Sequence, residues 1–342
     1  MRAAIFERPG AAQTCVTVPD PRAGAGDLIV KVAYSGVCGT DLHLTQSGMD
    51  TALPAGMILG HEFSGEVAEV GPEARGAFRV GDRVTVMPYR ACPACGALCR
   101  DGLDIICPNV AYLGLAAPGG NAQYVAANAA QAIRLRDAVD PLAGALVEPL
   151  AVGLHSVRRA GALQDANVLV IGGGPVGLAV TIFARLAGAA TVMVSEPHPS
   201  RRERARAFMA TAVADPAAGP LEDAFRDHAG GPPDVVFECV GVPGMIQEAV
   251  RQARLFGRVV VVGACMEQDH IHPLSALTKE ITMTFALGHD RGDFNAVIGH
   301  LRDGSFDARG LVTRVVGFED FPTAFEALRT DKDACKVLLR PN

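Results

Sequence analysis

Short hydrophobic runs separated by turn residues fill the first part of the chain. Up to about residue 150 these runs are of β-type composition and are bounded by Gly, Pro and Asp. Short strands at regular spacing are typical of a small β-barrel. We therefore expect strands at residues 28–32, 65–70, 83–86 and 122–125.

The pattern changes from about residue 152. Short apolar runs now alternate with segments of helical periodicity, such as residues 176–188. The expected strands are residues 168–171, 191–194, 234–238 and 258–262. This alternation predicts an α/β fold with a parallel, doubly wound sheet. From about residue 289 the pattern is mixed again, and it ends in a strand-like run at residues 336–339.

Composition and charge exclude several classes of protein. The 342 residues are 49% hydrophobic and carry a formal net charge of −6, which gives no general attraction to nucleic acid or to acidic membranes. Residues 1–10 contain no apolar stretch of the length that a signal peptide needs. The apolar region 168–194 is interrupted by a glycine-rich turn and carries Arg185, so it does not read as a membrane span. We expect a cytoplasmic protein with neither a nucleic-acid nor a membrane partner.

A glycine-rich turn joins the first expected strand of the second region to its helix. Glycines at such a junction permit a tight turn and let the backbone approach a pyrophosphate, which the helix N-terminus then binds. The predicted cofactor-binding residues of this turn are Gly172, Gly174, Pro175, Val176 and Gly177.

Glu196 ends the next expected strand, about twenty residues beyond the glycine-rich turn. A carboxylate at this place hydrogen-bonds the ribose hydroxyls and repels a 2′-phosphate, so NAD is favoured over NADP. Arg201 completes the predicted cofactor-binding set. The basic run that continues through Arg202, Arg204 and Arg206 leaves two interpretations open, a solvated helix face and capture of a phosphate.

Candidate metal ligands are spread over the first region. They are Cys38, the pair His61 and Glu62, and Glu148. A thiolate, an imidazole and carboxylates are the protein ligands that zinc takes when one coordination position stays open for a substrate. A Lewis-acid site followed by a dinucleotide-binding turn points to hydride transfer between an alcohol or ketone and NAD(P).

Three stretches resemble the signatures of the zinc-dependent medium-chain alcohol dehydrogenases. They are residues 36–43, 60–67 and 80–84, and the resemblance extends over essentially the whole chain. It implies a GroES-like β-barrel catalytic domain at 1–151, a Rossmann NAD-binding domain at 152–288, and a return to the catalytic domain at 289–342. Glutamate rather than cysteine at position 148 resembles the polyol, 2,3-butanediol and sorbitol dehydrogenase branch.

The resemblance also assigns roles at the catalytic zinc. Cys38, His61 and Glu148 are the implied zinc ligands, and Glu62 ligates directly or during exchange of substrate and water. Asp41 orients His61 through the second ring nitrogen, with Lys336 expected to pair with Asp41 from the tail. Residues Thr40 and His43, expected in the same loop as Cys38, would relay the substrate proton through the cofactor ribose to solvent.

The implied activity is oxidation of a secondary alcohol, diol or polyol by NAD to the ketone. An L-threonine 3-dehydrogenase-like enzyme is the alternative, and a non-catalytic crystallin-like or binding protein on the same fold is the alternative of another class. The resemblance further implies a homodimer or homotetramer, and we expect contact through the edge strand near residues 281–285.

Four cysteines form a second candidate zinc site, a structural one. They are Cys92, Cys95, Cys99 and Cys107. Their spacing is C-x2-C-x3-C-x7-C, one residue longer than the C-x2-C-x2-C-x7-C of the family. One added loop residue costs little chain entropy, so the loop can bulge and still bring Cys99 to the metal. A zinc-free lobe or an alternative pairing of the cysteines remains open, and a nucleic-acid-binding zinc module is disfavoured because this segment is not basic.

Overall fold

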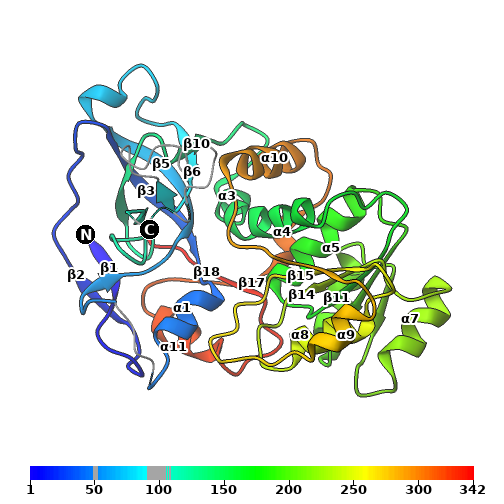
Figure 1. Cartoon of the computed structure of the whole chain (residues 1–342). Coiled ribbons are helices and arrows are strands. Elements are labelled where there is room, and N and C mark those ends of the chain that lie inside the picture. Colours follow the sequence, from blue (N-terminus) through cyan, green and yellow to red (C-terminus); the bar gives the residue numbers. More distant parts are fainter. Residues whose placement is uncertain (49–52, 91–104, 106, 108) are drawn as a thin grey trace. The chain divides into compact units, whose positions relative to one another are not determined.

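The computed structural model describes residues 1–48, 53–90, 105, 107 and 109–342. The chain divides into two compact units, whose elements are labelled in Figure 1. The first unit combines Met1–Glu148 with Asp290–Asn342, and the second is Pro149–His289. Among the described residues, none of the helices has both the length and the apolar character that crossing a membrane requires.

The first unit is built mainly of β-strands. Its elements are β1 (Arg2–Phe6), β2 (Thr14–Thr17), β3 (Asp27–Gly36), α1 (Gly39–Leu44), β4 (Met57–Ile58), β5 (Glu62–Val70), the 3-10 turn η1 (Pro72–Ala74), β6 (Arg83–Val86), β7 (Tyr89–Arg90), β8 (Ala111–Tyr112), β9 (Tyr124–Asn128), β10 (Ala132–Arg134), α3 (Pro141–Ala145), the start of α4 (Val147–Ala160), α10 (Arg291–Arg302), η3 (Ala308–Leu311), β17 (Val312–Val316), α11 (Phe321–Ala327) and β18 (Lys336–Leu339). The main sheet has the order β10-β6-β5-β3-β18-β17, and β9 also pairs with β3.

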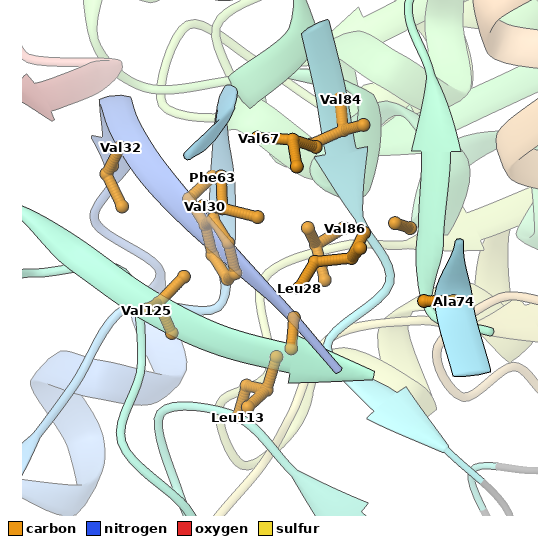
Figure 2. Packing of buried hydrophobic residues seen from close by; sticks show 12 residues of the cluster. Leu28, Val30, Val32, Phe63, Val67, Ala74, Val84, Val86, Leu113 and Val125 are labelled. Carbon is orange, nitrogen blue, oxygen red and sulfur yellow. The ribbon is translucent and has the colours of Figure 1, made fainter. Parts of the chain in front are cut away.

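Alternating side chains of these strands form the core of the first unit. Along β9, buried and partly exposed positions alternate, as expected for a strand with one face on a core. Figure 2 shows the cluster, in which Leu28, Val30 and Val32 of β3 lie among side chains from the neighbouring strands. The other labelled members are Phe63, Val67, Ala74, Val84, Val86, Leu113 and Val125. This packing fixes β3, which ends just before Cys38, and β5, which begins at Glu62.

The tail of the chain completes this sheet. Strand β18 lies antiparallel to β3, with Leu338 opposite Gly36, and β17 pairs parallel with β18. Gly36 is in turn opposite Glu62 on β5. Residues near 36, 62 and 336 are therefore brought together by sheet register, although they are far apart in the sequence.

The second unit is a six-stranded parallel sheet with the order β13-β12-β11-β14-β15-β16. Its elements are β11 (Asn167–Ile171), α5 (Pro175–Leu186), β12 (Thr191–Ser195), α6 (Pro199–Ala207), β13 (Ala212–Ala214), α7 (Leu221–Ala229), β14 (Val235–Glu238), α8 (Met245–Gln252), β15 (Arg258–Val261), α9 (Pro273–Leu277) and β16 (Thr282–Phe285). The predicted combination of a β-rich domain and a parallel, doubly wound sheet is confirmed.

The turn from β11 into α5 depends on glycine. Gly172 has φ of +102°, a conformation that other residues rarely adopt. A Cβ on Gly177 would collide with the carbonyl oxygen of Gly172, so only glycine permits the helix to start this close to the strand. Pro175 occupies the first turn of α5, where its missing N–H costs no helical hydrogen bond.

Two local predictions need correction. The strand expected at residues 122–125 is observed at Tyr124–Asn128, and Ala122 makes only an isolated bridge to Ala3. The expected loop that carries Thr40 and His43 is the short helix α1, because Asp41 caps its own helix at Cys38.

Candidate functional site

Helix α1 holds Cys38 in a fixed position. Cys38 is the N-cap in extended conformation, and its N–H donates to Asp41 Oδ2 at 3.0 Å. At the other end of the helix, Arg329 donates to the carbonyl of Leu42 at 2.6 Å and to the hydroxyl of Thr45 at 2.8 Å. The backbone on which the Cys38 thiol stands is thereby held from both ends.

Three potential ligand side chains meet at the start of β5. His61 and Glu62 lie where the strand begins, and one ligand atom each of Cys38, His61 and Glu62 lie within 4.8 Å of one another. The side chains of His61 and Glu62 are almost completely buried, and Cys38 is partly buried. The structure therefore brings together three of the four residues predicted as catalytic zinc ligands.

The Asp41 carboxyl lies beside the imidazole ring of His61. Its Oδ1 atom lies 3.4 Å from His61 Nδ1, and the Asp41 carboxyl is completely buried. Burial lowers the pKa of His61, but the negative charges of Asp41 and Cys38 outweigh burial and raise this pKa well above its usual value. With Nδ1 turned toward Asp41, the other ring nitrogen is left for a metal, the usual arrangement for a metal-ligating histidine.

Lys336 pairs with Glu62 and not with Asp41, so the predicted partner is wrong. Lys336 Nζ donates to both carboxylate oxygens of Glu62, to Oε2 at 2.6 Å, and to the carbonyl of Val37 at 3.2 Å. The register of β18 against β3 places Lys336 beside the start of β5, whereas Asp41 already accepts the N–H of Cys38. Burial raises the pKa of Glu62, and Lys336 opposes this rise without cancelling it.

Glu148 stands in the first turn of α4 and is buried. Its charge acts on the pKa of Glu62, of Tyr112 and of Lys336, which places it within electrostatic reach of the cluster. It is not one of the three residues whose ligand atoms lie within 4.8 Å of one another. The Tyr112 ring, which sequence reasoning did not identify, packs edge-on against His61 with ring centroids 5.9 Å apart.

The charge balance of this cluster fits a divalent cation. Asp41, Glu62, Glu148 and the Cys38 thiol face one lysine, Lys336, and one histidine, His61, among the described residues. Buried carboxylates are costly unless paired with positive charge or bound to a metal. A thiol, an imidazole and carboxylates form a donor set suited to zinc.

The two predicted proton-relay residues share one face of α1. Thr40 and His43 are three residues apart, and residues at this spacing are neighbours on a helix surface. Thr40 is half-buried and His43 is exposed. Of the predicted structural zinc ligands, Cys92, Cys95 and Cys99 lie outside the described residues, and Cys107 is buried. The structural zinc site therefore stays a prediction.

Glu196 lies beside the glycine-rich turn in the second unit. The carboxylate is buried, and it accepts the N–H of Gly173 at 2.9 Å and the N–H of His198 at 2.9 Å. It thereby ties the end of β12 to the turn at the N-terminus of α5. Its place at the carboxyl edge of a parallel sheet is that of the acidic residue which reads the adenosine ribose in dinucleotide-binding folds.

The arginines that follow have different surroundings. Arg201 lies 3.9 Å from the Glu196 carboxylate. Arg202 donates to the carbonyls of Glu196 and Pro197, each at 2.7 Å, and forms an ion pair with Asp215 at 3.1 Å. Arg202 is therefore engaged in holding the loop between β12 and α6.

Two family models match the chain. Residues 24–137 match the alcohol dehydrogenase GroES-like domain, and residues 175–303 match the zinc-binding dehydrogenase domain. The (R,R)-butanediol dehydrogenase of Bacillus subtilis is 33% identical, over 95% of each chain. The 2-dehydro-3-deoxy-L-galactonate 5-dehydrogenase of Pseudoalteromonas atlantica is also 33% identical, over 93% of this chain and 92% of that relative.

A solved structure is similar over almost the whole chain. It is a zinc-binding dehydrogenase of Sinorhizobium meliloti bound to NADP, with 32% identity and a TM-score of 0.90. The similarity covers 99% of each of the two chains. Both units and the order in which they occur are thus shared with a protein that binds a nicotinamide dinucleotide.

Replacement of Lys336 tests the charge balance of the buried cluster. Lys336→Met leaves the buried Glu62 carboxylate without its cation, and we expect a loss of about 3 kcal/mol or more in the free energy of unfolding. The measurement is urea unfolding with a chelator present. Adding Glu62→Gln removes the uncompensated charge and should restore much of the loss.

Lys31→Met, at an exposed position of β3, is the control and should change stability by less than about 0.5 kcal/mol. If the double variant is no more stable than Lys336→Met, the lysine acts by packing and not by its charge.

Proposed function

The chain belongs to the zinc-dependent medium-chain alcohol dehydrogenases, and we propose that it uses NAD to oxidise the secondary hydroxyl of a diol or polyol to the ketone. Members of this family are oxidoreductases that act on the CH–OH group of small molecules, with zinc and a nicotinamide dinucleotide as cofactors. The observation that carries the proposal is the buried cluster of Cys38, His61 and Glu62.

The proposed zinc ligands are Cys38, His61 and Glu148, with Glu62 in reach of the same position. When bound, zinc supplies a Lewis acid that lowers the pKa of an alcohol hydroxyl beside it. The contact of Lys336 with both oxygens of Glu62 restrains that carboxylate, which favours Glu148 as the third lasting ligand. Asp41 keeps His61 in the orientation that ligation requires.

Two residues of helix α1 can remove the proton of the substrate hydroxyl. We propose that the hydroxyl of Thr40 accepts the substrate proton and that His43, exposed on the same face of α1, releases a proton to solvent. The half-buried position of Thr40, two residues after Cys38, supports this role. His43 supplies an imidazole, which can both accept and donate a proton.

The names of two relatives support the substrate class. One acts on (R,R)-butanediol and the other on position 5 of a deoxy sugar acid. A carboxylate at position 148 supports the same choice through the polyol-branch resemblance. The cytoplasmic location stays a prediction from the sequence.

A substrate panel tests this proposal. NADH formation is followed with 2,3-butanediol, sorbitol, xylitol, 1-phenylethanol and L-threonine, and metal content is measured on the same preparations. We expect turnover of at least one diol or polyol. Cys38→Ser should remove both this activity and bound zinc, because it replaces a thiolate ligand. Cys15→Ser, in strand β2 of the same unit, is the matched control and should retain both.

Two outcomes contradict the proposal. Activity confined to L-threonine assigns the L-threonine 3-dehydrogenase alternative. Zinc retained without hydride transfer from any member of the panel to NAD supports a non-catalytic protein on this fold.

Cofactor choice is expected to follow the charge of Glu196. NAD should exceed NADP in kcat/KM by at least about tenfold, which corresponds to about 1.4 kcal/mol. Glu196→Gln removes the repulsion of a 2′-phosphate while an amide oxygen remains for the backbone, so the ratio should fall. Glu203→Gln, exposed on α6, should leave the ratio unchanged. Equal use of both cofactors by the unaltered protein contradicts the assignment.

The edge strand β16 supports the predicted homodimer or homotetramer. It ends the sheet of the second unit, and Phe285, Leu287 and Leu277 near it are each more than 60% exposed. An exposed edge strand leaves backbone N–H and C=O groups unpaired and can accept a strand of another chain, and apolar side chains beside it favour such pairing. We propose that β16 pairs with its own copy about a two-fold axis.

Sedimentation velocity tests this assembly. Phe285→Asp places like charges across the proposed two-fold axis and should at least halve the molecular mass observed in solution. Val315→Asp, an exposed apolar position of the edge strand β17 in the first unit, is the control and should not change it. An assembly that Phe285→Asp leaves intact must use another surface.

A further inference from the structure

A second buried glutamate lies at the carboxyl edge of the parallel sheet. Glu238 ends β14 and is 1% exposed. Its Oε1 atom accepts the N–H of Val240 at 2.6 Å and the N–H of Gly241 at 2.9 Å. Hydrogen bonds from backbone amides to a carboxylate are charge-assisted and stronger than neutral ones. The carboxylate therefore fixes the path of residues 239–241.

The same residue also holds the loop that follows β15. The carbonyl oxygen of Glu238 accepts the N–H of Val262 at 2.8 Å and the N–H of Gly263 at 2.9 Å. A Cβ on Gly263 would come within 2.7 Å of Glu238 Oε2, and a Cβ on Gly241 would come within 2.7 Å of the backbone of Ala264. The two loops are in close contact, and Glu238 lies at their junction.

These loops also reach the glycine-rich turn. A Cβ on Gly172 would come within 2.9 Å of the Val240 side chain and within 3.2 Å of the carbonyl oxygen of Cys239. The loop after β14 therefore packs against the turn where β11 ends. The ends of β11, β14 and β15, neighbours in the sheet and in Figure 1, form one connected edge.

The order of strands in the sheet predicts that the two halves of the cofactor lie beside different strands. Glu196 follows the last residue of β12, on one side of β11, and the proposed pyrophosphate site is the N-terminus of α5, which follows β11. A dinucleotide with its adenosine half beside β12 must extend its other half toward β14, on the opposite side of β11. The loop that Glu238 shapes lies on that side.

We propose that Glu238 is a positioning residue for the nicotinamide half of the cofactor, acting through the backbone of residues 239–241. In this proposal Glu196 contacts the adenosine ribose, and Glu238 sets the shape of the surface on which the nicotinamide lies. This inference rests on the proposed orientation of the cofactor at the glycine-rich turn.

Binding of NADH and of ADP-ribose, which lacks the nicotinamide, separates the two halves. Calorimetric titration of Glu238→Ala should show the Kd for NADH raised at least about tenfold, while the Kd for ADP-ribose changes by less than about threefold. Glu238→Gln keeps one oxygen that can accept both amides, so it should recover much of the NADH affinity. Glu196→Ala should weaken both ligands to a similar extent.

Asp234→Asn is the matched control for a purely structural role. Asp234 precedes β14, at the opposite end from Glu238, and accepts the N–H of Asn167 at 2.7 Å. The variant should reduce thermal stability and leave both affinities unchanged. If Glu238→Ala does not fold, Glu238→Asp, which withdraws the carboxylate by one methylene, should show the same split between ligands.

The outcomes separate the two proposals. Failure of the unaltered protein to bind ADP-ribose, or binding that Glu196→Ala leaves unchanged, contradicts the proposed cofactor site. Equal weakening of both ligands by Glu238→Ala, or of neither, with ADP-ribose bound normally by the unaltered protein, overturns the role of Glu238 alone.

Discussion

The ion pair between Lys336 and Glu62 sets the conditions for the rest of the candidate metal centre. Glu62 is completely buried, and a buried carboxylate persists in its charged form only beside a cation. Lys336 supplies that cation and also donates to Val37, next to Cys38. The pair thus links the start of β5, the approach to α1 and the last strand, and it leaves His61 and Cys38 turned toward a common point. Without it, the acids around His61 would repel one another.

Features that depend on a few consecutive residues could be predicted from the sequence. Cys38, His61 and Glu62 come from short motifs next to strands, and the sheet register brings these motifs together as the family resemblance implies. The glycine-rich turn is similar, because the positive φ of Gly172 and the close approach at Gly177 are requirements of a few consecutive residues. The family and its two-domain fold are also confirmed, because the motifs that indicate them consist of a few consecutive residues.

Interactions that depend on register between distant strands could not be predicted. Lys336 was expected to pair with Asp41. The sequence does not determine the register of β18 against β3, and this register places Lys336 beside Glu62 instead. The contact of Tyr112 with His61 joins strand β8 to the start of β5, two segments far apart in the sequence, and no motif indicates it. Glu238 did carry a signal, an acid at the end of an apolar strand, but its hydrogen bonds to the following loop became visible only in the structure.

The position of β18 also determines when the centre can form during synthesis. The sheet of the first unit is completed by residues that leave the ribosome after all of the second unit. A nascent chain that has reached residue 300 contains Cys38, His61, Glu62 and Glu148 but lacks the lysine that neutralises Glu62. Domains generally fold as units in the order of their synthesis. In this chain the sheet of the first unit is complete only once β18 has been synthesised, so the second unit can fold before it.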